Sequence, residues 1–227
     1  MFLQKALAIL AKAFCNLILC YQIFIYQINK TSIFERYTME KLRKHIEEII
    51  PISDDEFESI KPFFTIRKVL KNQYLIQQGD EAKYEYIIMS GIFRVFYLDE
   101  DGKEHIVQFA TENWWMSDYI AYFNQKQDNM YVVCMQPGEV LCLTLDGREK
   151  LSDTLHKMEH FFRIKLTKGF IALQQRVISL LSNNPQQRYE EFADLYPNLM
   201  QKIPKKYTAE YLGISRETLS RLYSNNK

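Results

Sequence analysis

Arg216, Glu217, Ser220 and Arg221 lie close together near the C-terminus, at a spacing that places them on one face of a helix. Arginine donates paired hydrogen bonds to guanine and glutamate accepts one from cytosine N4, so these residue types suit contacts with base edges. Neighbouring lysine, tyrosine and hydroxyl side chains can bind phosphate oxygens. The predicted DNA-binding residues are Lys205, Lys206, Tyr207, Ser215, Arg216, Glu217, Thr218, Ser220 and Arg221.

Two crossing helices are needed to present those side chains, and the segment from Ile203 has the pattern of a helix-turn-helix. Ala209 is small enough for the crossing point, and Gly213 can adopt a positive φ in the turn. Ser215 is placed to cap the second helix. The apolar residues expected to pack beneath that helix are Leu212, Ile214, Leu219 and Leu222. The complete set favours DNA binding over a small helical subdomain with a solvated basic face.

Upstream, the residues after Pro62 follow a period of two, which is typical of strands. Turn-forming residues, Gly91 and Pro137-Gly138 among them, separate short runs rich in β-branched and aromatic side chains. These runs are Phe64–Leu70, Tyr74–Gln77, Glu85–Ser90, Ile92–Leu98, Glu104–Ala110, Tyr131–Gln136 and Val140–Leu145. They predict an α+β protein with an antiparallel β-roll of the cupin or jelly-roll type. Two short helices, over residues 40–50 and after a cap at Ser53, should precede the roll.

From Asp146 the pattern becomes helical, and large apolar residues recur at threes and fours for about six turns. Packing on the roll would explain part of such a stripe. Pairing with the same helix of a second copy explains so many apolar residues better. The predicted dimer interface is Leu151, Leu155, Met158, Phe162 and Leu166, with Leu173 further along the same stripe.

The N-terminal segment 6–28 is the most hydrophobic in the chain, but Lys12 and several amide side chains interrupt it. Three interpretations stay open: an extension that is not part of the native protein, with translation starting at Met39; an amphipathic packing helix; and a membrane anchor. Residues 1–38 are therefore treated as an uncertain extension.

The composition is that of a globular protein, with 47% hydrophobic and 25% charged residues among 227. The net charge is +1, but from Lys202 onward six basic residues face two acidic ones, a balance that suits nucleic acid. Cys134 and Cys142 fall in apolar runs and are expected to be buried, reduced thiols of a cytoplasmic protein. The sequence has no CxxC pair, Gly-rich phosphate loop or HExxH pair, so neither an enzyme nor a metal or cofactor site is expected.

The segment Ser215-Arg216-Glu217-Thr218-Leu219-Ser220-Arg221 closely resembles the recognition-helix signature of the Crp/Fnr family of bacterial regulators. Gly79, Tyr86 and Gly91 also have that family's spacing, and the resemblance covers roughly residues 45–227. It implies a cyclic-nucleotide-binding-like β-roll, a long dimerisation helix and a winged helix-turn-helix that binds a palindromic site. By the same resemblance, the residues that touch bases are Arg216, Glu217 and Arg221.

Two departures from that family concern ligands. Residues 111–130, where cyclic-nucleotide binders hold the phosphate, contain no Gly and no Arg, and three acidic residues outnumber Lys126. Cyclic AMP is therefore not expected to bind. An iron–sulfur cluster is not expected either, because Cys15 and Cys20 lie in the uncertain extension. Haem ligation by His105 is less favoured than an ordinary strand histidine. Trp114, Trp115 and Asp118 either line an effector pocket or fill the space a nucleotide would occupy.

The expected organisation is thus a β-roll over 39–145, a dimerisation helix over 146–172 and a helix-turn-helix domain over 173–227. We expect a homodimeric transcriptional regulator that binds double-stranded DNA at an inverted repeat, with RNA polymerase and an unknown small-molecule effector as candidate partners. The alternative is a cyclic-nucleotide-binding sensory module that acts on a protein partner.

Overall fold

The computed structural model describes residues 35–127 and 129–225, and the chain forms two compact units, 1–44 and 45–227. Residues 35–47 are helical. The hydrophobic segment 6–28 lies outside the described residues, so its three interpretations are not tested. Among the residues that the structure does describe, no helix is both long enough and apolar enough to cross a membrane.

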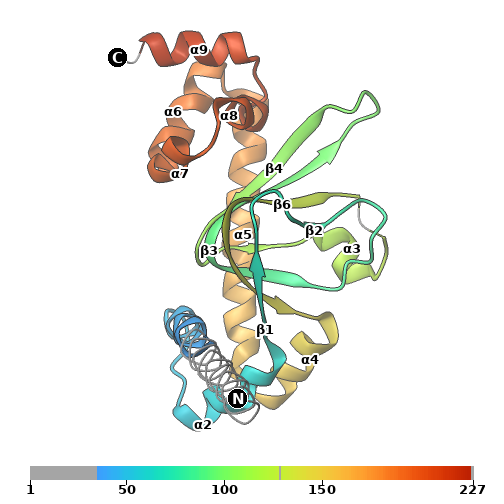
Figure 1. The fold of residues 1–227 in the computed structure, drawn as a ribbon. Helices are drawn as coiled ribbons and strands as arrows, with labels where there is room; N and C mark the ends of the chain where they lie inside the picture. The colour runs from blue at the N-terminus through green and yellow to red at the C-terminus, as the bar shows by residue number, and fades with distance from the viewer. Residues whose placement is uncertain (1–34, 128, 226–227) are drawn as a thin grey trace, which may run out of the picture. The chain divides into compact units, whose positions relative to one another are not determined.

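The second unit contains one antiparallel sheet, which confirms the predicted fold class (Figure 1). Its strands are β1 (Thr65–Val69), β2 (Tyr74–Ile76), β3 (Glu85–Leu98), β4 (Glu104–Ala110), β5 (Trp115–Met116) and β6 (Tyr131–Leu143). The strand order is β1-β6-β3-β4, while β2 pairs with β6 and β5 pairs with β3. Helix α2 (Asp54–Ile60) and a 3₁₀ turn (Lys61–Phe63) precede the sheet, and α3 (Tyr119–Asn124) lies between β5 and β6.

Helix α2 begins as the sequence predicts. The Ser53 hydroxyl accepts a hydrogen bond from the Glu56 N–H at 3.3 Å, and the Glu56 carboxylate accepts one from the Ser53 N–H at 2.8 Å. This reciprocal capping box satisfies two N–H groups that the first helical turn would otherwise leave without partners.

Gly91 and Gly138 do not end strands, contrary to the sequence-based expectation of turns at both positions. Each lies inside a long strand, and the pairing of β3 with β6 shifts register on either side of Ser90. Gly91 has φ +94, and a Cβ on Gly138 would lie 2.0 Å from the Ser90 carbonyl oxygen. The two strands therefore cross too closely for any side chain, and glycine allows them to bend without breaking.

The interior of the roll is filled by apolar side chains from several strands, among them Tyr86, Ile88, Phe93, Val95, Met116, Val132 and Val140. Cys134 and Cys142 are buried free thiols, as expected. Burial raises the pKa of each thiol to about 11, so both behave as small apolar side chains rather than as reactive thiolates.

The remaining described residues, 144–225, contain helices and no strand. The helices are α4 (Leu145–Thr154), α5 (Lys157–Ser182), α6 (Pro185–Leu195), α7 (Pro197–Lys202), α8 (Lys205–Leu212) and α9 (Arg216–Asn225). Two expectations were wrong here. Instead of one dimerisation helix over 146–172, the chain forms two helices separated at Leu155–His156, and the second extends past residue 172. The hairpin wing implied by the family resemblance is not present among residues 144–225.

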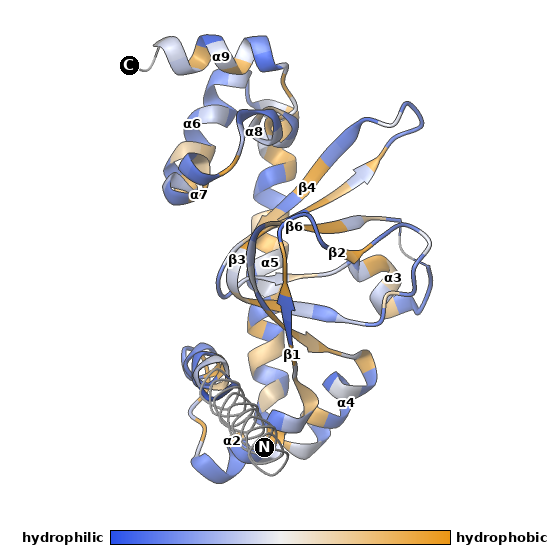
Figure 2. Cartoon of the chain, in the orientation of Figure 1, coloured by the Kyte–Doolittle hydropathy of each residue, from blue (hydrophilic) through white to orange (hydrophobic). Residues whose placement is uncertain are grey.

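Helix α5 runs along the sheet, with α4 near its N-terminal end and α6–α9 at the other end (Figure 1). Its first turns are buried against the unit's own core through Met158, Phe161 and Phe162. Beyond them its apolar side chains are largely exposed, and apolar positions recur along the helix (Figure 2). Of the predicted dimer interface, Leu151, Met158 and Phe162 are therefore already buried within one chain, Leu155 is half-buried, and Leu166 is 44% exposed.

Candidate nucleic-acid interface

Helices α8 and α9 form the predicted helix-turn-helix. Gly213 has φ +65, and this left-handed turn lets the Gly213 and Ile214 N–H groups donate to the carbonyls of Glu210 (3.3 Å) and Ala209 (3.0 Å). The side chain of Ala209 is buried, as a crossing point requires. The roles predicted for Ala209 and Gly213 are thus confirmed.

The second helix of the pair is held by a cap and by an apolar underside. The Thr218 N–H donates to the Ser215 hydroxyl at 3.1 Å, which caps α9. Leu212 and Leu219 are buried, while Ile214 and Leu222 are half-buried in the same cluster. Packing on this side fixes which face of α9 points to solvent.

The outward face of α9 carries Arg216, Glu217, Ser220 and Arg221, and all four are exposed. Hydrogen bonds from its own backbone N–H and from the Ser215 hydroxyl lower the pKa of Glu217, so this carboxylate is ionised at neutral pH and able to accept hydrogen bonds. The Arg221 guanidinium lies 3.4 Å from the Thr218 hydroxyl and otherwise reaches into solvent. This face presents two long cations and one anion side by side.

The residues predicted to bind phosphate divide into two groups. Lys205 and Lys206 are exposed at the start of α8; Lys205 lies over the Tyr223 ring at 4.3 Å, and Lys206 is 3.7 Å from Glu210. Tyr207, by contrast, is half-buried, because its ring packs against an arginine from the sheet. Tyr207 therefore contributes to packing, and Ser215 and Thr218 contribute mainly to the cap of α9.

Trp114, Trp115 and Asp118 each contact a different structural partner. Trp114 packs on Tyr196 with ring centroids 5.4 Å apart, whereas Trp115 donates from Nε1 to Nε2 of His45 at 3.1 Å. Asp118 is buried and accepts hydrogen bonds from the N–H groups of Ile120 and Ala121, which caps α3. These contacts favour the alternative in which the side chains fill space within the protein, and the effector pocket stays a prediction.

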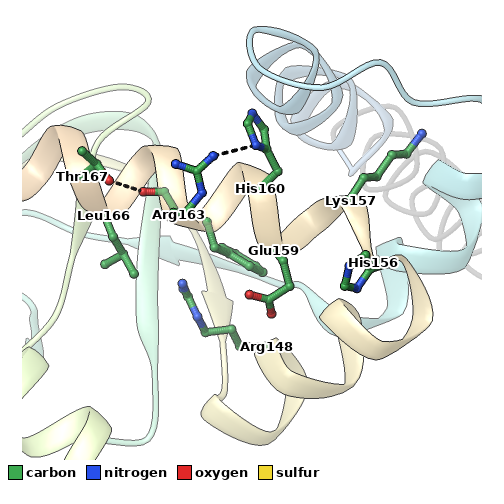
Figure 3. Close-up of a pocket in the computed structure, with 9 residues that line it drawn as sticks. Arg148, His156, Lys157, Glu159, His160, Arg163, Leu166 and Thr167 are labelled. Carbon is green, nitrogen blue, oxygen red and sulfur yellow. Dashed lines mark hydrogen bonds between the residues drawn. The ribbon is translucent and has the colours of Figure 1, made fainter.

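An open hollow of about 510 Å³ lies instead beside the first turns of α5 (Figure 3). Its lining residues are Arg148, His156, Lys157, Glu159, His160, Phe162, Arg163, Leu166 and Thr167. Its cations already have partners: Arg148 pairs with Glu85 at 2.5 Å, Lys157 with Glu56 at 2.7 Å, and Arg163 with the His160 ring at 2.9 Å. Carboxylates thus pair with Arg148 and Lys157, while the positive charge of the exposed Arg163 is not neutralised by the His160 ring.

Sequence reasoning missed the residues that join the helix-turn-helix to the sheet. Arg94, Glu104 and Arg176 contact or approach α8 from β3, β4 and α5. One feature of the sequence could have indicated this joint: Arg94 interrupts the apolar run of β3, and a buried arginine requires a partner. Its partner on α8 lies more than a hundred positions along the chain, which no local pattern indicates.

The sheet and its flanking helices match a known domain family. Residues 66–157 match the cyclic nucleotide-binding domain family. The fold agrees: the structure of the regulator CLP of Xanthomonas campestris, described as responsive to c-di-GMP, superimposes with a TM-score of 0.62 at 13% identity, over 76% of this chain and 91% of that one.

Named relatives extend the similarity beyond this domain. Regulatory protein HlyX of Actinobacillus pleuropneumoniae is 25% identical over 75% of each chain, and the cAMP-activated regulator CRP of Salmonella typhimurium is 24% identical over 76% of this chain and 87% of that one. The match to the anaerobic regulatory protein of Bacillus subtilis, 26% identical, spans 44% of this chain and 42% of that protein. In sequence and in fold the chain is thus similar to transcriptional regulators of the Crp/Fnr type.

Proposed function

We propose that this chain is a dimeric, cytoplasmic transcription factor that binds an inverted repeat in duplex DNA. The observation that carries the proposal is the outward face of α9, where Arg216, Glu217, Ser220 and Arg221 are exposed on a helix whose other side is packed. A helix presented in this way can enter the major groove, where arginine binds guanine and glutamate binds cytosine.

The partner for α5 is a second copy of the same helix. Exposed apolar residues follow one another at intervals of four and three, the spacing of a coiled-coil seam: Leu166, Phe170, Leu173, Val177 and Leu180. Leu166 belongs to the interface predicted from the sequence, and the other four extend that interface toward the C-terminal end of α5. A two-fold pair through this stripe, named here the α5 seam, gives two recognition helices for two half-sites.

Cyclic AMP is not the signal in this proposal. A cyclic nucleotide would need cations for its phosphate, but residues 111–127 contain β5 and α3, with the Asp118 carboxylate buried at the start of that helix. A buried carboxylate repels a second anion. We expect isothermal titration with cyclic AMP to give no saturable heat, and micromolar binding would contradict this part of the proposal. A different small molecule, and contact with RNA polymerase, stay compatible with the fold.

The DNA-binding proposal is tested by selecting bound sequences from random duplex DNA with the purified chain, then measuring affinity for the selected repeat. Wild-type protein should enrich an inverted repeat. Arg216→Ala should lower discrimination at one base position of each half-site by about 1–3 kcal/mol while leaving binding to random duplex nearly unchanged.

The matched control is Arg163→Ala, which removes the same side chain from an exposed site near the start of α5. It should leave both the affinity and the preferred sequence unchanged. Enrichment of no repeat by the wild-type protein, or equal effects of the two substitutions, would refute the proposal.

A further inference from the structure

Arg94 of β3 is inserted between two aromatic rings, one of which belongs to the helix-turn-helix. Its guanidinium lies 4.2 Å from the centroid of Phe96 on the same strand and 4.2 Å from that of Tyr207 on α8. Glu104 of β4 holds the guanidinium through two contacts, one of which joins Nη2 to Oε1 at 3.2 Å. Only 6% of Arg94 is exposed, so this contact is shielded from solvent and salt.

Arg176 of α5 makes a second connection at the other end of α8. Its Nη2 donates to the carbonyl oxygen of Ile106 on β4 at 2.8 Å and to that of Tyr211 on α8 at 2.9 Å. The guanidinium also lies 3.5 Å from the centroid of the Tyr211 ring. One side chain thus joins α5, the sheet and the last turn of α8.

Tyr207 and Tyr211 are four residues apart, one helical turn, so they lie on the same face of α8. Each ring packs against one guanidinium, and apolar contacts continue the joint: Phe109 of β4 lies 5.2 Å from Tyr211 and 6.3 Å from Phe192 of α6 between ring centroids. Helix α8 is thereby fixed at both ends on the edge of the sheet. Because α8 and α9 share a buried core, the orientation of α9 is fixed as well.

From these contacts we infer that Arg94 and Arg176 form an arginine clamp that sets the separation of the two recognition helices in a dimer. Arg94 and Arg176 are positioning residues that need not touch DNA. The inference rests on the proposed function, because it concerns the spacing of the two half-sites that such a dimer binds. It assigns to the β3–β4 hairpin, part of the sensory domain, control over which spacing is accepted.

The physical basis is preorganisation. With α8 clamped, the two α9 helices of a dimer approach the DNA in one fixed relative orientation. Binding to an operator with another spacing then requires the contacts between α8 and the sheet to break. Inserting two base pairs between half-sites turns one of them by about 70° around the duplex. With α8 loosened, each helix-turn-helix can follow its own half-site, so spacing matters less and affinity for the preferred spacing falls.

The test uses Arg94→Lys in the full chain. Lysine keeps the charge beside Glu104 but lacks the planar group that stacks on two rings. Affinity is measured for the selected repeat and for versions with two base pairs inserted or removed. We expect wild-type protein to prefer the selected spacing by at least about tenfold, and Arg94→Lys to reduce that preference to roughly threefold or less. Binding to a single half-site should be unchanged.

Arg67→Lys is the matched control, the same substitution on β1 of the same sheet, which pairs with β6. It should keep the wild-type preference. If Arg94→Lys lowers the melting temperature so far that it cannot be assayed, Tyr207→Leu removes the other side of the contact and should give the same loss of spacing preference.

Retention of the wild-type spacing preference by both Arg94→Lys and Tyr207→Leu would overturn the clamp, as would a wild-type protein indifferent to spacing. Failure of the wild-type protein to bind any repeat would instead overturn the proposed function, so the two failures are distinguishable.

Discussion

His45 is a buried histidine with a defined hydrogen bond and an unusual charge environment. Its Nε2 accepts from Trp115, and its ring meets Phe161 edge-on with centroids 5.8 Å apart. Burial, and then the positive charge of Lys165, lower its pKa from 6.5 to about 4, although Glu48 acts in the opposite direction. The imidazole is therefore neutral in the folded protein at pH 7.

This gives a pH prediction with a definite sign. Between pH 6.5 and 4 the unfolded chain binds a proton that the folded chain does not, so stability is complete above pH 6.5 and is lost as the pH falls. The free energy of unfolding should drop by about 2 kcal/mol from pH 7 to pH 5 on account of His45. His45→Gln keeps a hydrogen-bond acceptor for Trp115 and should remove that part of the drop in urea unfolding.

His156→Gln serves as the control, because His156 is exposed and its change should leave the pH dependence as it is in the wild type. An unaltered drop in His45→Gln would show that other groups cause the acid sensitivity.

Single residues were predicted from the sequence where their role is local. Gly213, Ser53 and Ser215 act within a few positions of themselves, and turn or cap chemistry is enough to predict them. Partners far apart in the chain were not predictable. The Trp115–His45 hydrogen bond and the Arg94–Tyr207 stack depend on how the strands and helices pack in three dimensions. The periodicity of a single segment does not predict such packing.

At the level of elements, α5 is the helix whose exposed side needs a partner. The α5 seam leaves Phe170 66% exposed and Val177 46% exposed in the single chain. Pairing two seams would remove this apolar surface from water, at about 25 cal/mol for each Å². The gain would be lost if a carboxylate had to be buried there without a partner.

Val177→Glu should therefore convert a dimer into a monomer in sedimentation velocity at micromolar concentration, and should weaken binding to the inverted repeat more than tenfold through loss of the second half-site. Gln175→Glu introduces the same side chain at an exposed position of α5 outside the seam. It should stay dimeric. A monomeric wild-type protein, or a dimeric Val177→Glu variant, would contradict pairing through α5.

The extent of α5 also shows where element prediction stopped short. Apolar spacing predicted a helix, but it could not tell the buried first turns from the exposed later ones, because both repeat at threes and fours. The glycines inside β3 and β6 led to a different error, the prediction of turns where the strands continue. A glycine that permits two strands to cross has the same local appearance as one that makes a turn, since the deciding contact is with another strand.

On the scale of the whole molecule, the roll, α5 and the helix-turn-helix belong to one compact unit, residues 45–227. The class of fold and the exposed face of α9 were predictable, because each is determined by residue patterns within one continuous segment of the chain. The joint between them was not, because it combines β3, β4, α5 and α8. In the proposed clamp, a change in the roll that moves the β3–β4 hairpin would act on α8 through Arg94, and on α5 and α8 together through Arg176.

The exposed apolar stripe on α5 has a consequence for the concentration of the protein in a cell. A lone chain carries a strip of bare apolar surface that invites proteases, chaperones and unwanted association, whereas a paired chain hides it. Pairing is a mass-action step, so the pool of intact protein should grow faster than its rate of synthesis. For the proposed dimeric regulator, abundance is then itself an input to gene control, and a small rise in expression is amplified.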